Sequence, residues 1–102
     1  MKQRYTLAPE AARDLVQIWH YLKKESCQET ADRVESVIRD KFKYLAEFPH
    51  AGHWRRDLTG ADVRFYPVYS YLIVYRPESS PLQIVSVLHA SRDVPRILAQ
   101  RP

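Results

Sequence analysis

The chain has 102 residues, of which 45% are hydrophobic and 27% are charged, and its formal net charge is +4. This length suits one domain with one core, and the composition excludes a disordered chain. Two glycines are too few for a glycine-rich phosphate-binding loop, and the single cysteine, Cys27, excludes an intrachain disulfide and suits a reducing compartment. No long apolar run is present, so we expect a cytoplasmic protein without a signal peptide and without membrane contact.

The first predicted element is a strand over residues 3–7, where polar and apolar side chains alternate. Pro9 then suits the first turn of a helix over residues 9–24, because no hydrogen bond is lost there. The apolar stripe of this helix consists of Ala8, Ala11, Ala12, Leu15, Ile18, Trp19 and Leu22. One face of the helix is therefore predicted to pack on a core.

A second helix is predicted over residues 27–48. Ser26-Cys27-Gln28-Glu29 has the pattern of a capping box, in which the Ser26 hydroxyl accepts the Glu29 N–H, and Pro49 prevents continuation. The apolar positions are Ala31, Val34, Val37, Ile38, Phe42, Leu45 and Phe48. Because the break between the two helices is short, we expect an antiparallel helical hairpin.

The second half of the chain is predicted to form most of a sheet. A loop over residues 49–62 precedes three strands, at 63–66, 69–76 and 82–89, and a short helix over 94–99 follows them. The breaks at Pro67-Val68 and from Pro77 to Pro81 are short, which favours an antiparallel meander. The predicted class is α+β, a single domain over residues 1–102 in which the helical hairpin packs on a small, mostly antiparallel sheet.

Arginines gather in the second half of the chain, where lysine is absent after Lys43. They are Arg55, Arg56, Arg64, Arg76, Arg92, Arg96 and Arg101. A guanidinium presents a planar fork that suits phosphate or carboxylate, so the partner could be a nucleic acid or an acidic protein. For each arginine, ordinary solvated surface charge is the alternative.

Two further patterns are weaker. His50 and His53 have the spacing of metal ligands, but no cysteine or carboxylate pair nearby completes a site, so no metal and no cofactor are predicted. Tyr66, Tyr69, Tyr71 and Tyr75 could stack on bases, as aromatic residues on a sheet do in single-strand binders. Packing against a helix is the favoured role for Tyr71 and Tyr75, which share one face of the central strand.

Several strings, taken in order, resemble the RelE/ParE toxin superfamily, and its ParE branch most closely. They are Pro9-Glu10-Ala11, the segment from Leu45 to Gly52, Val63-Arg64, the segment from Tyr71 to Arg76, and the segment from Val87 to Asp93. The resemblance spans about residues 5–98 and implies a βααβββ fold. It also implies the toxin half of a type II toxin–antitoxin pair, which is neutralised by direct binding of a cognate antitoxin.

The resemblance implies one of two activities: ParE-type toxins inhibit DNA gyrase, and RelE-type toxins cleave mRNA in the ribosomal A site. Arg64 and Arg92 match arginine positions that contact the phosphate in the RNase branch, and His89 could act as acid or base. The chain lacks the lysine-rich loop of that branch and a tyrosine after Arg92. Gyrase inhibition is therefore the preferred prediction, with the ribosome-dependent RNase and a non-toxic antitoxin-binding module as alternatives.

Two surfaces are predicted on this basis. The target-binding surface consists of Arg55, Arg56, Arg64, Arg76 and Arg92 around His89, and Arg64, His89 and Arg92 would form the catalytic centre of the RNase alternative. The antitoxin-binding surface contains Trp19, Tyr21 and Leu22, because the aromatic residues of the hairpin cannot all face the sheet.

Overall fold

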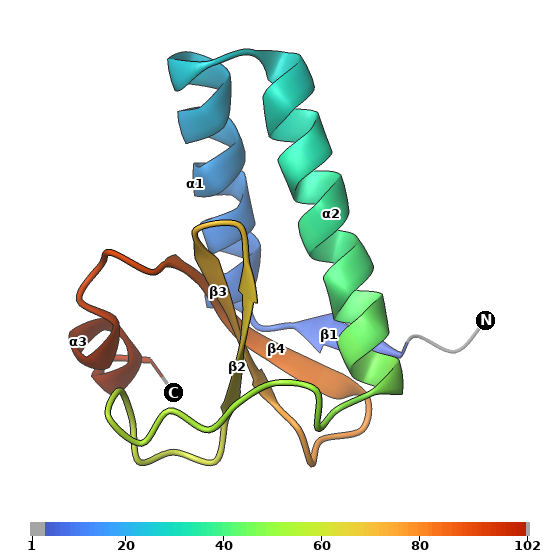
Figure 1. The fold of residues 1–102 in the computed structure, drawn as a ribbon, viewed down its shortest axis with the longest axis vertical. Helices are drawn as coiled ribbons and strands as arrows, with labels where there is room; N and C mark the ends of the chain where they lie inside the picture. The colour runs from blue at the N-terminus through green and yellow to red at the C-terminus, as the bar shows by residue number, and fades with distance from the viewer. Residues whose placement is uncertain (1–3, 102) are drawn as a thin grey trace.

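The computed structural model describes residues 4–101, and Figure 1 shows its course. The elements are β1 (Tyr5–Leu7), α1 (Pro9–Glu25), α2 (Gln28–Glu47), β2 (Arg64–Val68), β3 (Tyr71–Arg76), β4 (Leu82–His89) and α3 (Val94–Ala99). The predicted α+β class, a helical hairpin on a small sheet with βααβββ order, is confirmed. Residue 3, predicted to open the first strand, lies outside the described range.

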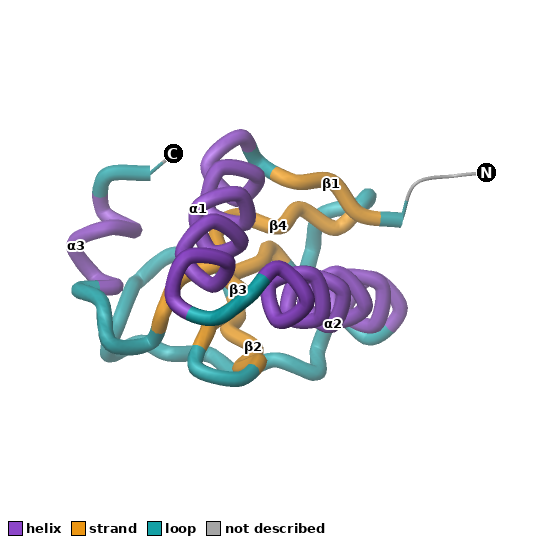
Figure 2. Tube along the Cα trace, turned by 90° about the horizontal axis from the view of Figure 1, so that it is seen from above, coloured by secondary structure: helices purple, strands orange, loops and turns teal. Residues whose placement is uncertain are grey.

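The four strands form one open sheet in the order β1-β4-β3-β2. β1 runs parallel to β4, whereas the pairs β4–β3 and β3–β2 are antiparallel. Figure 2, which looks along the helical hairpin, shows α1 and α2 over the sheet and α3 apart from them at its side. The parallel pair arises because the hairpin carries the chain from β1 to the meander that ends in β4.

Both faces of the sheet are buried, each in its own core. The core on the hairpin side contains Ala11, Leu15, Ile38, Phe42, Leu45, Val68, Tyr71, Ile73, Tyr75, Leu82, Ile84 and Val87. The core on the opposite face contains Val63, Phe65, Leu72, Val74, Val85, Leu88 and Val94, with Leu58, Ile97 and Leu98 packed against it. Because strand side chains alternate between faces, β3 supplies Tyr71, Ile73 and Tyr75 to one core and Leu72 and Val74 to the other.

The structure corrects the predicted break at Pro67-Val68. β2 continues through both residues, and the turn lies at Tyr69, whose φ of 54° is in the left-handed region. Phe65 exchanges backbone hydrogen bonds with His53 on the outer side of β2 (2.8 Å each), and Pro67 lies two residues further along the same side. At the edge of a sheet the missing N–H of a proline costs no ladder bond. The outer side of β2 is thereby closed to another strand.

The start of α2 also differs from the predicted capping box. The N-cap is Cys27, not Ser26, and its Sγ accepts the Thr30 N–H at 3.5 Å. The Ser26 hydroxyl instead bonds the Thr30 hydroxyl at 3.3 Å. Extended backbone at Cys27 places its side chain, one residue later than predicted, over the free N–H groups of the first turn.

Candidate functional site

A cavity with a volume of about 390 Å³ lies between α1 and the end of β4, and we call it the β4 pocket. It is lined by Asp14, Gln17, Ile18, Tyr21, Tyr71, Val87, His89, Ser91 and Arg92. The four residues from α1 follow the i, i+3, i+4, i+7 pattern, so they share one helical face. Tyr71 and His89 stand opposite each other in the β3–β4 register, which brings the strand residues to the same place.

His89 is held in one orientation by its own turn. Its Nδ1 accepts the Ser91 N–H at 3.1 Å and lies 2.6 Å from the Ser91 hydroxyl, and its ring meets the Tyr71 ring edge-on at 5.4 Å. Because Nδ1 accepts a hydrogen bond, the proton of the neutral imidazole lies on Nε2. Nε2–H is then the donor that remains for a ligand. Burial raises the pKa of the Tyr71 hydroxyl, and the nearby Tyr21 raises it further, so this phenol stays neutral.

Asp14 forms one wall of the β4 pocket and is 4% exposed. Its carboxylate accepts the Val87 N–H at 3.0 Å and two guanidinium N–H groups of Arg101, at 2.6 and 3.0 Å. Arg101 also donates to the Ser86 hydroxyl at 2.8 Å. Asp14 therefore satisfies the Val87 N–H, which lies on the edge of β4 beyond the residues paired with β1. The charge of Asp14 is balanced by Arg101 inside the protein.

Arg92 stands at the rim of the pocket and is exposed. Within residues 4–101, the ion pairs are Arg39–Glu35, Arg55–Asp57, Arg56–Asp62 and Arg101–Asp14, and Arg92 is in none of them. The adjacent carboxylate, Asp93, caps α3 by accepting the Arg96 N–H at 3.4 Å. The charge of Arg92 is thus available to a partner.

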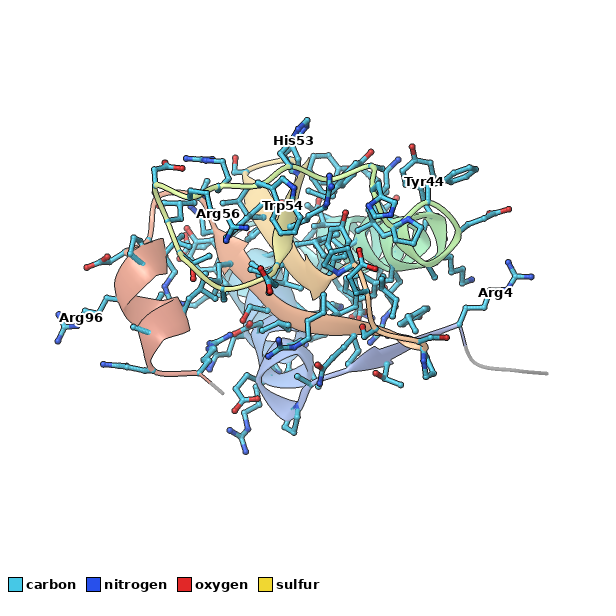
Figure 3. All side chains as sticks on the ribbon, turned by 90° about the horizontal axis from the view of Figure 1, so that it is seen from below. Arg4, Tyr44, His53, Trp54, Arg56 and Arg96 are labelled. Atoms are coloured by element: carbon cyan, nitrogen blue, oxygen red, sulfur yellow. The ribbon has the colours of Figure 1, made fainter. Side chains whose placement is uncertain are left out.

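A second group of arginines lies around Trp54 in the loop before β2, and we call Trp54, Arg55, Arg56 and Arg64 the loop cluster. Arg55 forms two bonds to Asp57, at 3.0 and 2.8 Å. Arg56 donates to the carbonyls of Gly60 and Ala61 and lies 4.8 Å from the Trp54 ring centroid. Figure 3 shows Trp54 and Arg56 together on the loop, whereas Arg96 projects from α3 at the far end of the view.

Arg64 fastens this loop to β2. One guanidinium nitrogen donates to the carbonyls of His50 and Gly52, at 3.1 and 2.8 Å, and the guanidinium carbon lies 4.6 Å from the Trp54 ring centroid. The hydroxyl of the buried Tyr75 accepts the Gly52 N–H at 2.8 Å and donates to the Pro49 carbonyl at 2.7 Å. The guanidinium of Arg64 therefore serves the fold.

The structure does not gather the predicted arginine surface around His89. Arg64 pairs with Tyr75 and His89 pairs with Tyr71, so four residues of β3, roughly 13 Å at ~3.3 Å per residue, separate their levels in the sheet. Arg76 lies on the face away from the hairpin and donates to the Gln83 side chain at 2.9 Å. Strand register therefore spreads the members of the predicted target-binding surface over the sheet. Of the predicted arginines, only Arg92 shares the pocket with His89.

The predicted antitoxin-binding residues Trp19 and Tyr21 do not lie on the same side of α1. Trp19 and Tyr21 are two residues apart on a helix and point about 200° apart around its axis. The indole N–H of Trp19 donates to Asp32 of α2 at 2.8 Å, whereas Tyr21 is 59% exposed and lines the β4 pocket. Leu22 is half-buried. The structure brings Tyr21 together with His89 and Arg92, which were predicted for a different partner.

Sequence reasoning missed Asp14 and Ser91 as pocket residues. Asp14 gave a usable signal, because a carboxylate between Ala11, Leu15 and Ile18 stands on the apolar stripe of α1. Ser91 gave none, since its role depends on the turn after β4. Within residues 4–101, no three His, Cys, Asp or Glu side chains could share a metal ion, and no helix there is long and apolar enough to cross a membrane.

Comparison with known proteins agrees with this fold. The family model for the ParE toxin of the type II toxin–antitoxin system parDE matches residues 5–94. A solved chain from the chromosomal ParDE toxin–antitoxin system of P. aeruginosa superposes with a TM-score of 0.72 and 20% sequence identity, covering 83% of this chain and 92% of that one. At this identity the likeness concerns the fold alone. No curated protein sequence matches the chain. The chain belongs to the ParE toxin family of type II toxin–antitoxin systems.

Proposed function

We propose that this toxin arrests growth by inhibiting DNA gyrase and that a cognate antitoxin neutralises it by direct binding at the β4 pocket. The toxin role follows from the family. One observation supports the rest: Tyr21, predicted for antitoxin contact, and His89 and Arg92, predicted for target contact, line the same cavity. A partner segment seated in that cavity would cover the residues that the target needs.

The separation of Arg64 from His89 favours gyrase inhibition over RNA cleavage. An RNase centre needs its cations and its acid or base to converge on one phosphate. Arg64 lies at the other end of the hairpin-facing side of the sheet, and its guanidinium already serves the His50 and Gly52 carbonyls. Arg92 and His89 alone make a contact surface, which suits an inhibitor that acts by binding.

The test is a supercoiling assay with purified toxin, gyrase and relaxed plasmid, run beside an mRNA-cleavage assay on programmed ribosomes. We expect loss of supercoiling with the mRNA left intact, and recovery when the protein from the adjacent reading frame is added. The Arg92→Gln variant should inhibit at least about tenfold less, since it loses a charge-assisted contact. Arg96→Gln, a neighbouring exposed arginine outside the pocket, should inhibit as the parent does.

Other results would select the alternatives. Cleavage of mRNA at a defined codon in the A site, with supercoiling unaffected, would establish the RNase activity and overturn the gyrase assignment. Binding of the neighbouring protein without an effect in either assay would identify a non-toxic binding module. Equal losses for Arg92→Gln and Arg96→Gln would remove the β4 pocket from the proposed contact surface.

A further inference from the structure

The β4 pocket offers hydrogen-bond donors, and the one carboxylate in its lining is already paired. The Asp14 carboxylate in its wall is occupied by Arg101 and by the Val87 N–H. Arg101, which does not line the pocket, balances the charge of Asp14, so Arg92 leaves one net positive charge at the pocket. The Nε2–H of His89 is a further donor at the pocket, because Nδ1 accepts the Ser91 N–H.

Part of the remaining lining is apolar, and Gln17 and Ser91 are further polar residues in it. Ile18 and Val87 come from opposite walls, α1 and β4, and the ring of Tyr71 is 8% exposed. Tyr21 stands at the opening with 59% of its surface exposed. A cavity of about 390 Å³ with partly apolar walls and a few placed donors suits a side-chain-sized ligand with an apolar body and one polar end.

We propose that the β4 pocket binds a carboxylate that a partner protein presents on a side chain next to an apolar one. The Arg92 guanidinium pairs with the carboxylate, His89 Nε2–H donates a second bond, and the apolar neighbour packs between Ile18 and Tyr71. The inference rests on the proposed function, since the partner it supposes is the neutralising antitoxin. It adds the chemistry by which that partner would be recognised, an acidic anchor residue.

The surroundings of the pocket favour a protein carboxylate over a nucleic-acid phosphate. Nucleic-acid binding draws on several free cations that follow the phosphate backbone. Here Arg55, Arg56 and Arg64 are engaged within the loop cluster, and Arg76 is bonded to Gln83 on the other face of the sheet. A single free guanidinium over an apolar cavity matches one carboxylate instead.

The experiment is an NMR titration of the ¹⁵N-labelled full chain, prepared by cell-free synthesis, with 3-phenylpropionate as the probe. The neutral 3-phenylpropanamide is the matched control ligand, and phenyl phosphate represents the phosphate alternative. We expect 3-phenylpropionate to shift the amide signals of Val87, His89 and Ser91 with saturation. The amide should bind at least about tenfold more weakly, as expected for loss of a charge-assisted bond.

Two variants locate the site. Arg92→Gln should weaken 3-phenylpropionate binding at least about tenfold, whereas Arg96→Gln should change it less than about twofold. Equal weakening by both, or equal binding of acid and amide, would overturn the carboxylate site. Tighter binding of phenyl phosphate than of 3-phenylpropionate would reassign the pocket to phosphate. Spectra of both variants that superpose on the parent away from the pocket exclude misfolding as the cause.

The titration tests the carboxylate pocket, and the gyrase assay tests the proposed target, so either proposal can be rejected without the other. Probe binding at Arg92 without inhibition of supercoiling would keep the carboxylate pocket and reject the gyrase target. Inhibition of supercoiling by a chain that ignores 3-phenylpropionate would keep the toxin activity and reject the acidic anchor.

Discussion

The loop cluster and the β4 pocket both contain arginines, but folding uses them differently. In the loop cluster, Arg55 is bound to Asp57, and Arg64 donates to two backbone carbonyls. At the pocket, Arg101 is bound to Asp14, whereas Arg92 has no ion pair within residues 4–101. The arginines of the loop cluster thus hold the loop before β2 in place. Arg92, which follows β4, remains available to bind a partner.

Arginines that are bonded within the protein contribute to stability, whereas an unpaired arginine such as Arg92 is available for binding. A guanidinium that donates to backbone carbonyls stabilises the fold, and its loss leaves these acceptors without a protein donor. An exposed guanidinium without a partner adds little to stability, and it can pair with an external anion. The three predictions that follow test this separation, beginning with the largest expected effect.

Gly52→Ala should destabilise the protein most, by about 3 kcal/mol, because the close packing there leaves no room for a methyl group. A Cβ at residue 52 would lie 2.5 Å from the Tyr75 hydroxyl and 2.9 Å from the Phe65 carbonyl oxygen. Gly60→Ala in the same loop meets nothing within 4 Å and should change stability by less than about 0.5 kcal/mol. Urea unfolding of both variants measures the contrast, and equal stabilities would show that the loop is not fastened as described.

Arg64→Ala should lower the free energy of unfolding by about 2 kcal/mol, since two carbonyls lose a charged donor. Arg92→Ala should lower it by less than about 0.5 kcal/mol, as expected for an exposed side chain without a partner. Thermal and urea unfolding of the pair give the comparison directly. If Arg92→Ala proved the more destabilising, the assignment of the two arginines to fold and to partner would be reversed.

Tyr75→Phe should destabilise the protein less than Gly52→Ala or Arg64→Ala, by about 1 kcal/mol at neutral pH, because the Gly52 N–H loses its acceptor. Burial raises the pKa of the Tyr75 hydroxyl above its ordinary value near 10. Between the two pKa values the unfolded chain ionises and the folded chain does not, so stability falls as the pH rises through this range.

The variant should show a smaller fall above pH 10, and urea unfolding at pH 8 and at pH 10.5 would measure it. A fall as large in Tyr75→Phe as in the parent would assign the alkaline loss to other tyrosines, such as Tyr71, whose pKa is also raised.

Local spacing predicted the fold because both cores are built from regular alternation. Tyr71, Ile73 and Tyr75 alternate with Leu72 and Val74, so the strand can be found from five residues of sequence. The course of β2 could not be found in this way. Whether Pro67 ends a strand depends on whether that strand lies at an edge, and this is a property of the whole sheet.

Only part of the candidate site could be predicted, because some of its residues depend on contacts that are distant in the sequence. His89 and Arg92 were recognised from a string at the end of a strand, and that string folds locally. The partners of Asp14 lie 73 and 87 positions away, so its role could not be seen from its neighbours. The distance between Arg64 and His89 could not be predicted either, because a count of arginines carries no information on strand register.

The bond between Asp14 and Arg101 has a consequence for biosynthesis. Asp14 leaves the ribosome early, and the guanidinium that balances its charge is added 87 residues later. A long-range contact of this kind closes only when both ends of the chain are present. The Asp14 carboxylate in the wall of the β4 pocket therefore lacks its balancing charge until Arg101 has left the ribosome. This bond of the toxin therefore forms only after its own translation has passed Arg101.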